Sequence, residues 1–549
     1  MYASIPEMHD YLQNNPDKPF IQCEFVHAMG NGPGDIEDYY ELEEQYDTFV
    51  GGFIWEWCDH GVYMGTTNDG RKKYYYGGDS GEYPHDGNFC MDGMVYPDRT
   101  ISTGLKEYKN VHRPVRVHLE DAASGTYILQ NNLDFTNLKD YLYLTYQVLC
   151  DGEVVTEGEI RDTEVLDVAP RSKKSVRLPI TPCSNGKCSC IIRSHQLNAS
   201  RFTESGFELG FDQLFLNDND NTTVTCLLKT ESTDAPAITY KENDRYVYIN
   251  GDNFIYKYNK LTGLFDSMIY KNHSFLKRPM EMNIWRAPTD NDRIIKQLWY
   301  HAGYDCVQTR AYETSIENLE DGSLRICTTS SLAPVYRQRY LDIDTTWIIN
   351  PDGSIVSSME IERDAVMRGT YADYFHQPET KTFQNGVENM LAVNEAFLPR
   401  LGIRMFLPKA MNQAEYFGYG PFESYIDKHQ ASYIGKFTSD VSAMHEDYLR
   451  PQENGSHYNC DYVSVADDNR KLTVYNEKPI SFNLSEYTAE ELTNKAHNYE
   501  LEKSGYTVFC VDYRQSGIGS GSCGPQLAKK YRLDDTHYSF SFHLKPEVL

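Results

Sequence analysis

The stretch "PFIQCEFVHAMGNGPGDIEDYY", residues 19–40, passes from an apolar run into a glycine-rich loop and then into a helical pattern. The run has the length of a strand and carries a single carboxylate, Glu24. A second strand-like run, "GGFIWEW", follows at residues 51–57. Helical patterns surround both runs, in "IPEMHDYLQ", "GDIEDYYELEEQYD" and "TGLKEYKNVH". Because strands that alternate with helices build parallel sheets, residues 1–112 are predicted to be α/β.

The pattern changes after residue 112. Short strands follow one another in "VRVHLED", "GTYILQNNLDF", "DYLYLTYQVLCDGEVVTEGEI" and "SKKSVRLPI", and Asp151–Gly152 predicts a tight hairpin turn. Residues 113–230 are therefore predicted to form a β-sandwich. The segment "KTESTDAPAI" around Pro236 is interpreted as a linker. Residues 237–549 are again rich in strand patterns and predict one large β domain with two sheets.

Composition excludes several classes of protein. The 549 residues include 52 Lys and Arg against 80 Asp and Glu, which gives a formal charge of −28. Such a chain repels phosphate backbones, so we expect no nucleic-acid partner. No apolar run approaches the length of a membrane span, and the first residues lack the pattern of a signal peptide. The 13 cysteines suggest buried strand thiols, for example Cys150 and Cys226, in a cytoplasmic protein.

The ends of the first two predicted strands carry a carboxylate, Glu24, and an indole, Trp55. In a barrel of parallel strands the reactive groups lie at such ends. A carboxylate beside an aromatic surface suits glycoside hydrolysis, because the acid attacks the anomeric carbon while the indole stacks on the sugar. The alternative is that Glu24 caps the following helix or pairs with a nearby basic group.

Several longer motifs support the glycosidase interpretation. They run in order from residue 19 to about residue 525 and are "CEFVHAMGNGPG", "GGFIWEWCDH", "YGGDSGEYPHDGNFCMDGMVYPDR", "WRAPTDND", "YFGYGPFESYIDK", "RPQENG" and "GIGSGSCGP". In sequence and in order they resemble the β-galactosidases of glycoside hydrolase family 2. The resemblance implies a multidomain α/β plus all-β chain. Residues 1–112 would be the C-terminal portion of a (β/α)8 barrel, 113–230 an immunoglobulin-like sandwich and 237–549 a large β-sandwich.

The resemblance also implies functions for individual residues. Glu24 matches the catalytic nucleophile of a retaining hydrolase that removes terminal β-D-galactose, and the galactoside is the expected substrate. His27 and Met29 match residues that line the galactose pocket, and Trp55 matches the aromatic floor under the sugar ring. The alternative for His27 is a purely structural role, in which it only orients its loop.

The resemblance implies functions for residues in loops as well. Phe89 and Asp92 match a sodium site, to which Phe89 would offer its carbonyl and Asp92 its side chain; such oxygen ligands suit a hard cation. Cys523 lies where some relatives carry a tryptophan that receives the second sugar, and Glu453 lies in another loop that returns to the pocket. His85 falls in a loop that lies near a second metal in relatives.

A retaining glycosidase needs a second carboxyl group as acid/base. In the resembling family this group and the Mg²⁺ ligands precede the nucleophile by a long stretch, whereas only 23 residues precede Glu24 here. We therefore expect a truncated chain, or one completed by an N-terminal half, and a homo-oligomer in the full-length form. Two other hypotheses stay open. One is a non-catalytic sugar-binding or complementing subunit, and the other is a different family 2 activity such as β-glucuronidase or β-mannosidase.

Overall fold

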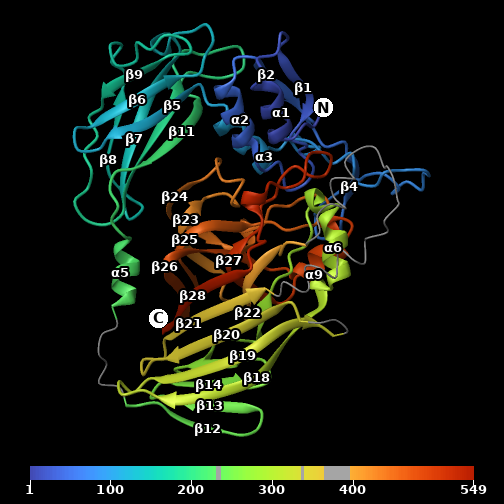
Figure 1. Cartoon of the computed structure of the whole chain (residues 1–549), viewed down its shortest axis with the longest axis vertical. Coiled ribbons are helices and arrows are strands. Elements are labelled where there is room, and N and C mark those ends of the chain that lie inside the picture. The colour runs from blue at the N-terminus through green and yellow to red at the C-terminus, as the bar shows by residue number, and fades with distance from the viewer. Residues whose placement is uncertain (230–235, 336–338, 364–395) are drawn as a thin grey trace.

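The structure is a computed structural model that describes residues 1–229, 236–335, 339–363 and 396–549. Strands dominate it, as expected, and they form stacked layers along the long axis of the molecule (Figure 1). The N-terminal α/β unit and a neighbouring sandwich occupy one end, and the large β region fills the rest. No helix in these described ranges is long and apolar enough to cross a bilayer.

The N-terminal unit is built on the parallel pair β1 (Phe20–Phe25) and β2 (Phe49–Ile54). Its helices are α1 (Ile5–Leu12), α2 (Ile36–Gln45) and α3 (Thr103–Val111), so the predicted strands and helices are confirmed. One face of the pair packs on a core that includes Met8, Leu12, Phe25, Ile36, Tyr39, Leu42 and Val111. The unit thus has its own apolar centre, which positions the end of β1.

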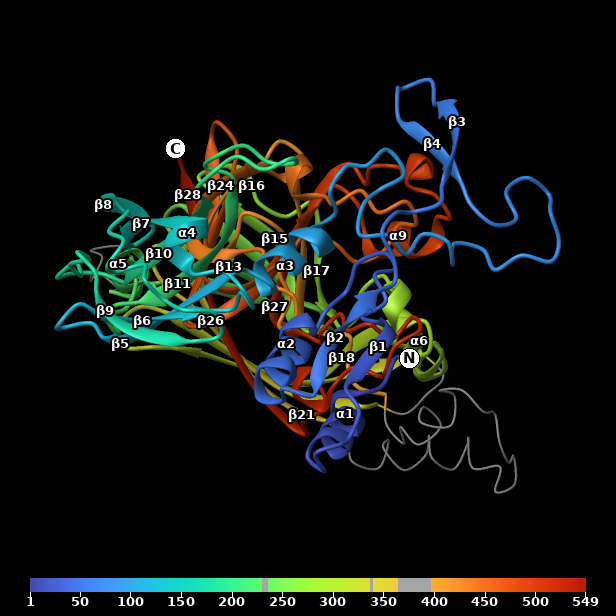
Figure 2. The same cartoon turned by 90° about the horizontal axis from the view of Figure 1, so that it is seen from above.

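The other face of this strand pair is open to solvent. Ile21, Val50 and Phe53 are 52%, 55% and 64% exposed. Beyond β2 the chain forms a hairpin that sequence analysis did not anticipate, β3 (Val62–Thr66) and β4 (Lys72–Tyr75), which projects from the body of the molecule (Figure 2). The exposed sheet face leaves an apolar surface beside the strand that carries Glu24.

The next region is a sandwich of two antiparallel sheets that share one core. The smaller sheet holds β5 (Val115–Asp121), β6 (Thr126–Asn131) and β9 (Lys173–Arg177). The larger holds β7 (Leu142–Cys150), β8 (Glu153–Ile160), β10 (Cys188–Gln196) and β11 (Glu208–Phe215). Asp151 and Gly152 turn between β7 and β8 with φ of 48° and 85°, so the predicted hairpin is confirmed.

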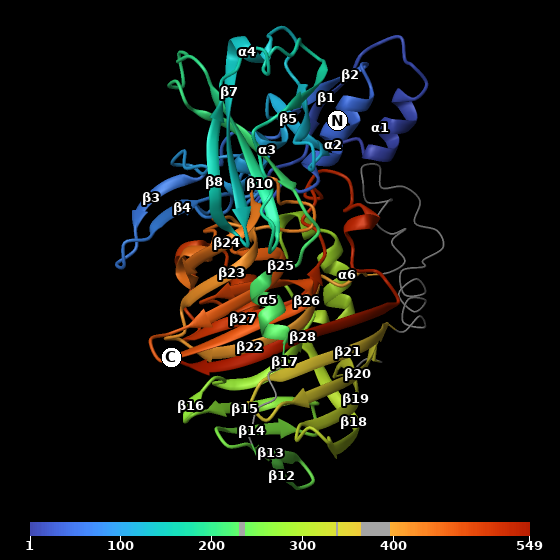
Figure 3. The ribbon, with the colours of Figure 1, turned by 90° about the vertical axis from the view of Figure 1, so that its left-hand side faces the viewer.

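Two short helices belong to the sandwich and its exit, α4 (Leu138–Tyr141) and α5 (Thr222–Leu228). Figure 3 shows α5 against the large β region, where Val224 packs with Phe417 and Tyr475. Cys226 lies on α5 and is exposed, so the expectation of a buried strand thiol there was wrong. Most of the predicted linker around Pro236 falls outside the described residues.

The large β region contains a five-stranded and a twelve-stranded sheet around one extended core. The strands of the smaller sheet are β12 (Thr239–Glu242), β13 (Tyr246–Asn250), β14 (Phe254–Asn259), β15 (Leu264–Tyr270) and β16 (His273–Ser274). The larger sheet begins with β17 (Arg278–Asn283), β18 (Val307–Asn318), β19 (Leu324–Pro334), β20 (Leu341–Ile349), β21 (Ile355–Arg363) and β22 (Arg400–Pro408). It continues with β23 (Gln413–Gly420), β24 (Tyr433–Asp440), β25 (Ser456–Ala466), β26 (Arg470–Ser485), β27 (Tyr506–Gln515) and β28 (His537–Val548). Two helices, α6 (Ile295–Ala302) and α9 (Ala489–Asn494), flank these sheets, and the domain boundaries expected from the sequence stay predictions.

The glycine-rich loop after β1 is held by hydrogen bonds to the large β region. Asn31 is fully buried, and its backbone and side chain make five hydrogen bonds to residues far along the chain. It donates to Gln452 Oε1, Tyr425 OH and the Glu453 carbonyl, and it accepts from Asn291 Nδ2 and Lys428 Nζ. These bonds satisfy every polar group of Asn31, so the loop is locked to the large β region.

Glycines allow the loop after β1 to lie this close to the large β region. A Cβ on Gly34 would stand 2.4 Å from Asp427 Oδ2, and a Cβ on Gly30 would stand 2.5 Å from Asp290 Oδ2. Gly30 also has φ of +60°, a backbone conformation that glycine adopts without strain. The three glycines in the opening stretch therefore serve contact between distant parts of the chain.

We expect Asn31→Ala to lower the free energy of unfolding by about 2–4 kcal/mol, because it leaves several buried partners without a hydrogen bond. Urea denaturation followed by tryptophan fluorescence measures the change. Asn68 is exposed, so Asn68→Ala serves as the matched control and is expected to stay within about 0.5 kcal/mol of the parent. Equal stability of the two variants would contradict the proposed lock.

Candidate active site

Glu24 lies near the carboxyl end of β1, half-buried beside the N-terminal residues. Its backbone carbonyl accepts a hydrogen bond from the Tyr2 N–H at 2.9 Å. Burial raises the pKa of the Tyr2 phenol far above its usual range, and the nearby Cys523 and Glu24 raise it further. Tyr2 is thus a neutral phenol beside the Glu24 carboxylate.

His27 is the centre of the polar contacts next to Glu24, and it is 1% exposed. Its Nδ1 lies 2.8 Å from Ser522 Oγ, and its Nε2 lies 3.4 Å from Asp92 Oδ2. Burial alone would lower the pKa of His27, but Asp92 and then Cys523 outweigh burial and raise the pKa to about 9. The imidazole is therefore a cation at neutral pH, with an N–H directed at each partner.

Asp92 holds a second aromatic group of the site. Trp55 Nε1 donates to Asp92 Oδ2 at 3.1 Å, which fixes the indole while the ring remains 41% exposed. The backbone of Trp55 also accepts a hydrogen bond from the Ala28 N–H at 2.8 Å. An oriented, exposed indole next to a carboxylate offers a stacking surface for a sugar ring.

The two predicted sodium ligands, Phe89 and Asp92, both lie beside His27. Asp92 is 3% exposed, and its Oδ1 has no hydrogen-bond partner among the described residues. The Phe89 ring lies 5.8 Å from the His27 ring. No group of three His, Cys, Asp or Glu side chains is placed to hold a metal in the described part of the chain. A buried, unpaired carboxylate oxygen fits a site that takes one carboxylate and backbone carbonyls.

Two other carboxyl groups lie near Asp92. Burial, then Asp92, raises the pKa of Glu56, which also lies 3.2 Å from His60 Nε2. Burial raises the pKa of Asp59 to about 7, although the Gly93 N–H opposes that shift. This part of the site therefore concentrates acidic groups near the His27 cation.

The remaining candidate residues lie at different distances from His27. Met29 is buried and lines a pocket that Phe89 shares. Cys523 is exposed and interacts electrostatically with His27 and Tyr2, so the structure brings this loop to the site. His85 is exposed, and its Nδ1 accepts a hydrogen bond from the Gly87 N–H at 3.1 Å.

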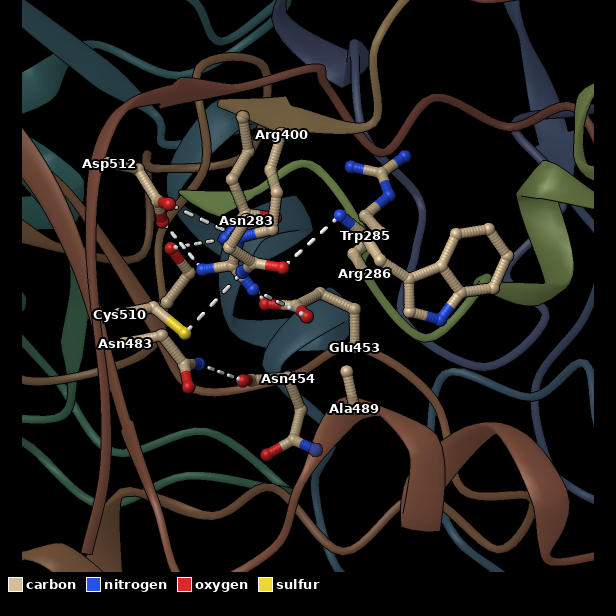
Figure 4. Close-up of polar contacts among 12 residues, drawn as sticks. Asn283, Trp285, Arg286, Arg400, Glu453, Asn454, Asn483, Ala489, Cys510 and Asp512 are labelled. Carbon is tan, nitrogen blue, oxygen red and sulfur yellow. Dashed lines mark hydrogen bonds and ion pairs between the residues drawn. The ribbon is translucent and has the colours of Figure 1, made fainter. Parts of the chain in front are cut away.

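Glu453 belongs to a separate buried network (Figure 4). Its carboxylate lies 3.4 Å from Arg400 Nη1 and accepts from Gln515 Nε2 at 3.1 Å. Arg400 also pairs with Asp512 at 2.5 Å. The structure therefore gives the Glu453 side chain a place inside the large β region and joins it to the first segment through its backbone carbonyl, which accepts from Asn31.

Sequence reasoning missed three residues that shape the site: Tyr2, Ser522 and Asn291. Ser522 Oγ donates to Asn291 Oδ1 at 2.9 Å while it contacts His27, so Asn291 orients the hydroxyl. Both residues stand inside the motifs "WRAPTDND" and "GIGSGSCGP", which contained the only available signal. Tyr2 has no pattern around it that marks it.

Comparisons with known proteins cover most of the chain. Residues 250–544 match the family described as beta galactosidase small chain, residues 1–117 match the TIM barrel domain of glycosyl hydrolases family 2, and residues 127–217 match domain 4 of beta-galactosidase. The beta-galactosidase of Actinobacillus pleuropneumoniae is 39% identical over 546 residues, 99% of this chain and 49% of that protein. The beta-galactosidase of Staphylococcus xylosus is 35% identical over 553 residues, 99% of this chain and 51% of that protein. The chain spans about half the length of these relatives.

The raised pKa of His27 predicts a pH dependence of stability. Because the pKa is higher in the folded state than its ordinary 6.5, protonation favours folding; the stabilisation is complete below about pH 6.5 and is lost as the pH rises through 9. Relative to His27→Gln, the parent should lose about 3 kcal/mol of unfolding free energy across this range.

Urea unfolding of both proteins at several pH values measures this difference, and NMR titration of labelled histidine measures the pKa itself. Asp92→Asn removes the principal cause and should move the titration of His27 towards neutral pH. A midpoint near 6.5 in the parent would contradict the assignment.

Proposed function

The chain belongs to the β-galactosidases of glycoside hydrolase family 2, and we propose that it carries the nucleophile of a retaining enzyme that hydrolyses terminal, non-reducing β-D-galactose residues. The observation that supports this most is the placement of Glu24 near the end of β1, three positions before the buried His27. The β1 residue after Glu24 pairs with the residue before the exposed Trp55. The relatives named beta-galactosidase are similar along 99% of this chain, which makes a lactose-like galactoside the first substrate to test.

The proposed architecture follows the same family. Residues 1–112 are assigned to the C-terminal portion of a (β/α)8 barrel, 113–230 to an immunoglobulin-like sandwich and 237–549 to a large β-sandwich. The parallel pairing of β1 with β2 and the helices on one face support the first assignment. The exposed face with Ile21, Val50 and Phe53 is where neighbouring barrel units would pack.

In the proposed mechanism, a Glu24 carboxylate oxygen attacks the anomeric carbon and the bond from that carbon to the leaving oxygen breaks. A carboxylic acid protonates the leaving oxygen and afterwards takes a proton from the water that cleaves the glycosyl–Glu24 bond. Trp55 stacks on the sugar. The His27 cation directs its two N–H groups at Ser522 and Asp92, so its role is to hold these two groups in position. Met29 and Cys523 line the pocket, where a thiol offers less stacking surface to the second sugar than an indole.

The acid/base and the Mg²⁺ ligands are assigned to an N-terminal half of the enzyme. We further propose a homo-oligomeric and cytoplasmic full-length form. A sodium ion held by the Phe89 carbonyl and Asp92 would bind a sugar hydroxyl, and the unpaired Asp92 Oδ1 supports this ligand. Glu453 is proposed to act on the sugar site only through its loop, because Arg400 and Gln515 occupy its carboxylate.

Glu24→Gln should lower turnover by several orders of magnitude in the active assembly, because the covalent step loses its attacking oxygen. Labelling with a 2-fluoro galactoside followed by peptide mapping tests the role directly and should place the label on Glu24. Glu41 is exposed on α2, so Glu41→Gln is the matched control and should retain activity and labelling. A label on another residue would overturn the assignment.

The 549-residue chain assayed alone should show no substantial turnover of a nitrophenyl galactoside, because protonation of the leaving oxygen contributes typically 10²–10⁴-fold. Adding a separately produced N-terminal half of the enzyme should restore activity. If the chain alone is active and Glu24→Gln abolishes that activity, an acid/base lies within the chain, and Glu56→Gln is the first variant to test. A complemented assembly without activity would favour a non-catalytic sugar-binding subunit.

A further inference from the structure

A second feature lies next to the candidate active site, a pocket of ≈ 440 Å³. Met29 and Phe89 line it on the side of His27, and Arg293, Lys296 and Arg450 line it from the large β region. The Phe89 ring lies 5.8 Å from the His27 ring, so the pocket adjoins the proposed sugar site. The proposed mechanism assigns no task to the three basic residues.

The charge of this pocket differs from that of the whole chain. The protein carries a formal charge of −28, whereas the pocket combines three basic residues with two acidic ones, Asp86 and Asp290. The Asp290 carboxylate is already occupied, because Asn88 Nδ2 donates to Oδ1 at 2.9 Å and Gln452 Nε2 donates to Oδ2 at 2.9 Å. Arg450 also lies 3.5 Å from Asp290 Oδ1. Asp290 is thus held by other partners, and its attraction only partly opposes the effect of burial on the pKa of Lys296.

Arg293 and Lys296 are the available cations. In the described part of the chain, neither side chain forms an ion pair or a hydrogen bond with an acidic group. The Arg293 guanidinium lies over the Phe89 ring at 4.9 Å, which directs it towards the sugar side of the pocket. Burial lowers the pKa of Lys296, and repulsion from Arg450 adds to that effect. An anion bound beside Lys296 would oppose both effects, because it stabilises the charged form of the amine.

The start of α6 strengthens the positive potential. Lys296 lies in the first turn of this helix, and Ile294 at the N-cap position offers no side chain to the free N–H groups. The N-terminal end of a helix carries a partial positive charge. The helix end alone would not define a site, but here it coincides with two unpaired cations at a pocket next to the sugar site.

We propose that this pocket binds an oxyanion substituent of the galactoside, such as a carboxylate, a sulfate or a phosphate. The inference rests on the proposed function and extends it, because it identifies a charged class of substrate. Arg293 would donate two parallel N–H bonds to such a group, and Lys296 would supply a compact charge. The oxyanion is carried either by the galactose itself or by the leaving group.

Calorimetric titration of the 549-residue chain tests the proposal without requiring turnover. Galactose 6-sulfate is compared with galactose for a substituent on the sugar, and lactobionate is compared with lactitol for a substituent on the leaving group. The anionic member of at least one pair should bind about tenfold more tightly than its neutral counterpart, as expected for one charge-assisted hydrogen bond. The preference should shrink with added salt.

Lys296→Gln should remove most of this preference, whereas Lys529→Gln, at an exposed lysine elsewhere, should retain it. The pair that shows the preference identifies the end of the substrate that carries the charge. Equal affinity within both pairs, no saturable binding of either anion, or a preference that survives Lys296→Gln would each overturn the proposal. The proposed function is judged separately, by labelling of Glu24 and by turnover of neutral galactosides in the active assembly.

Discussion

The fixed position of the loop after β1 is the constraint on which the site depends. Asn31 is held on every polar atom by residues from the large β region, and the glycines beside it allow that close approach. The loop begins two residues after Glu24 and contains His27, so its fixation aligns both groups. A catalytic carboxylate tolerates little displacement, and the fixed loop limits that displacement from the C-terminal side of the strand.

The Asp92 carboxylate contacts two other groups of the candidate site. One of its oxygens contacts both the Trp55 indole and the His27 imidazole, and the other remains without a partner in the described structure. The same carboxylate thus orients the exposed indole, raises the pKa of the histidine and keeps one oxygen unpaired. Because these contacts share one side chain, replacement of Asp92 would change the orientation of the indole and the charge of His27 together.

The local features of this fold were accessible from the sequence, and the long-range ones were not. Apolar periodicity located β1, β2 and the three helices of the first unit, and Asp151–Gly152 marked the hairpin between β7 and β8 of the sandwich. The motif around Glu24 identified the candidate site, whose residues stay a prediction. The contact of His27 with Ser522 spans 495 positions, and no local pattern contains such a distance. The loop of Glu453 stands in the local motif "RPQENG", so the sequence marks it. The buried pairing of Glu453 with Arg400 joins distant positions, and no local pattern predicts it.

The contact between His27 and Ser522 also has a consequence for the order in which the protein is made. The ribosome releases His27 495 positions before Ser522, and domains generally fold as they emerge. The Glu24 strand therefore waits through the synthesis of a long intervening segment before the Ser522 loop can contact its neighbour His27. A product that terminates before this loop lacks the contact.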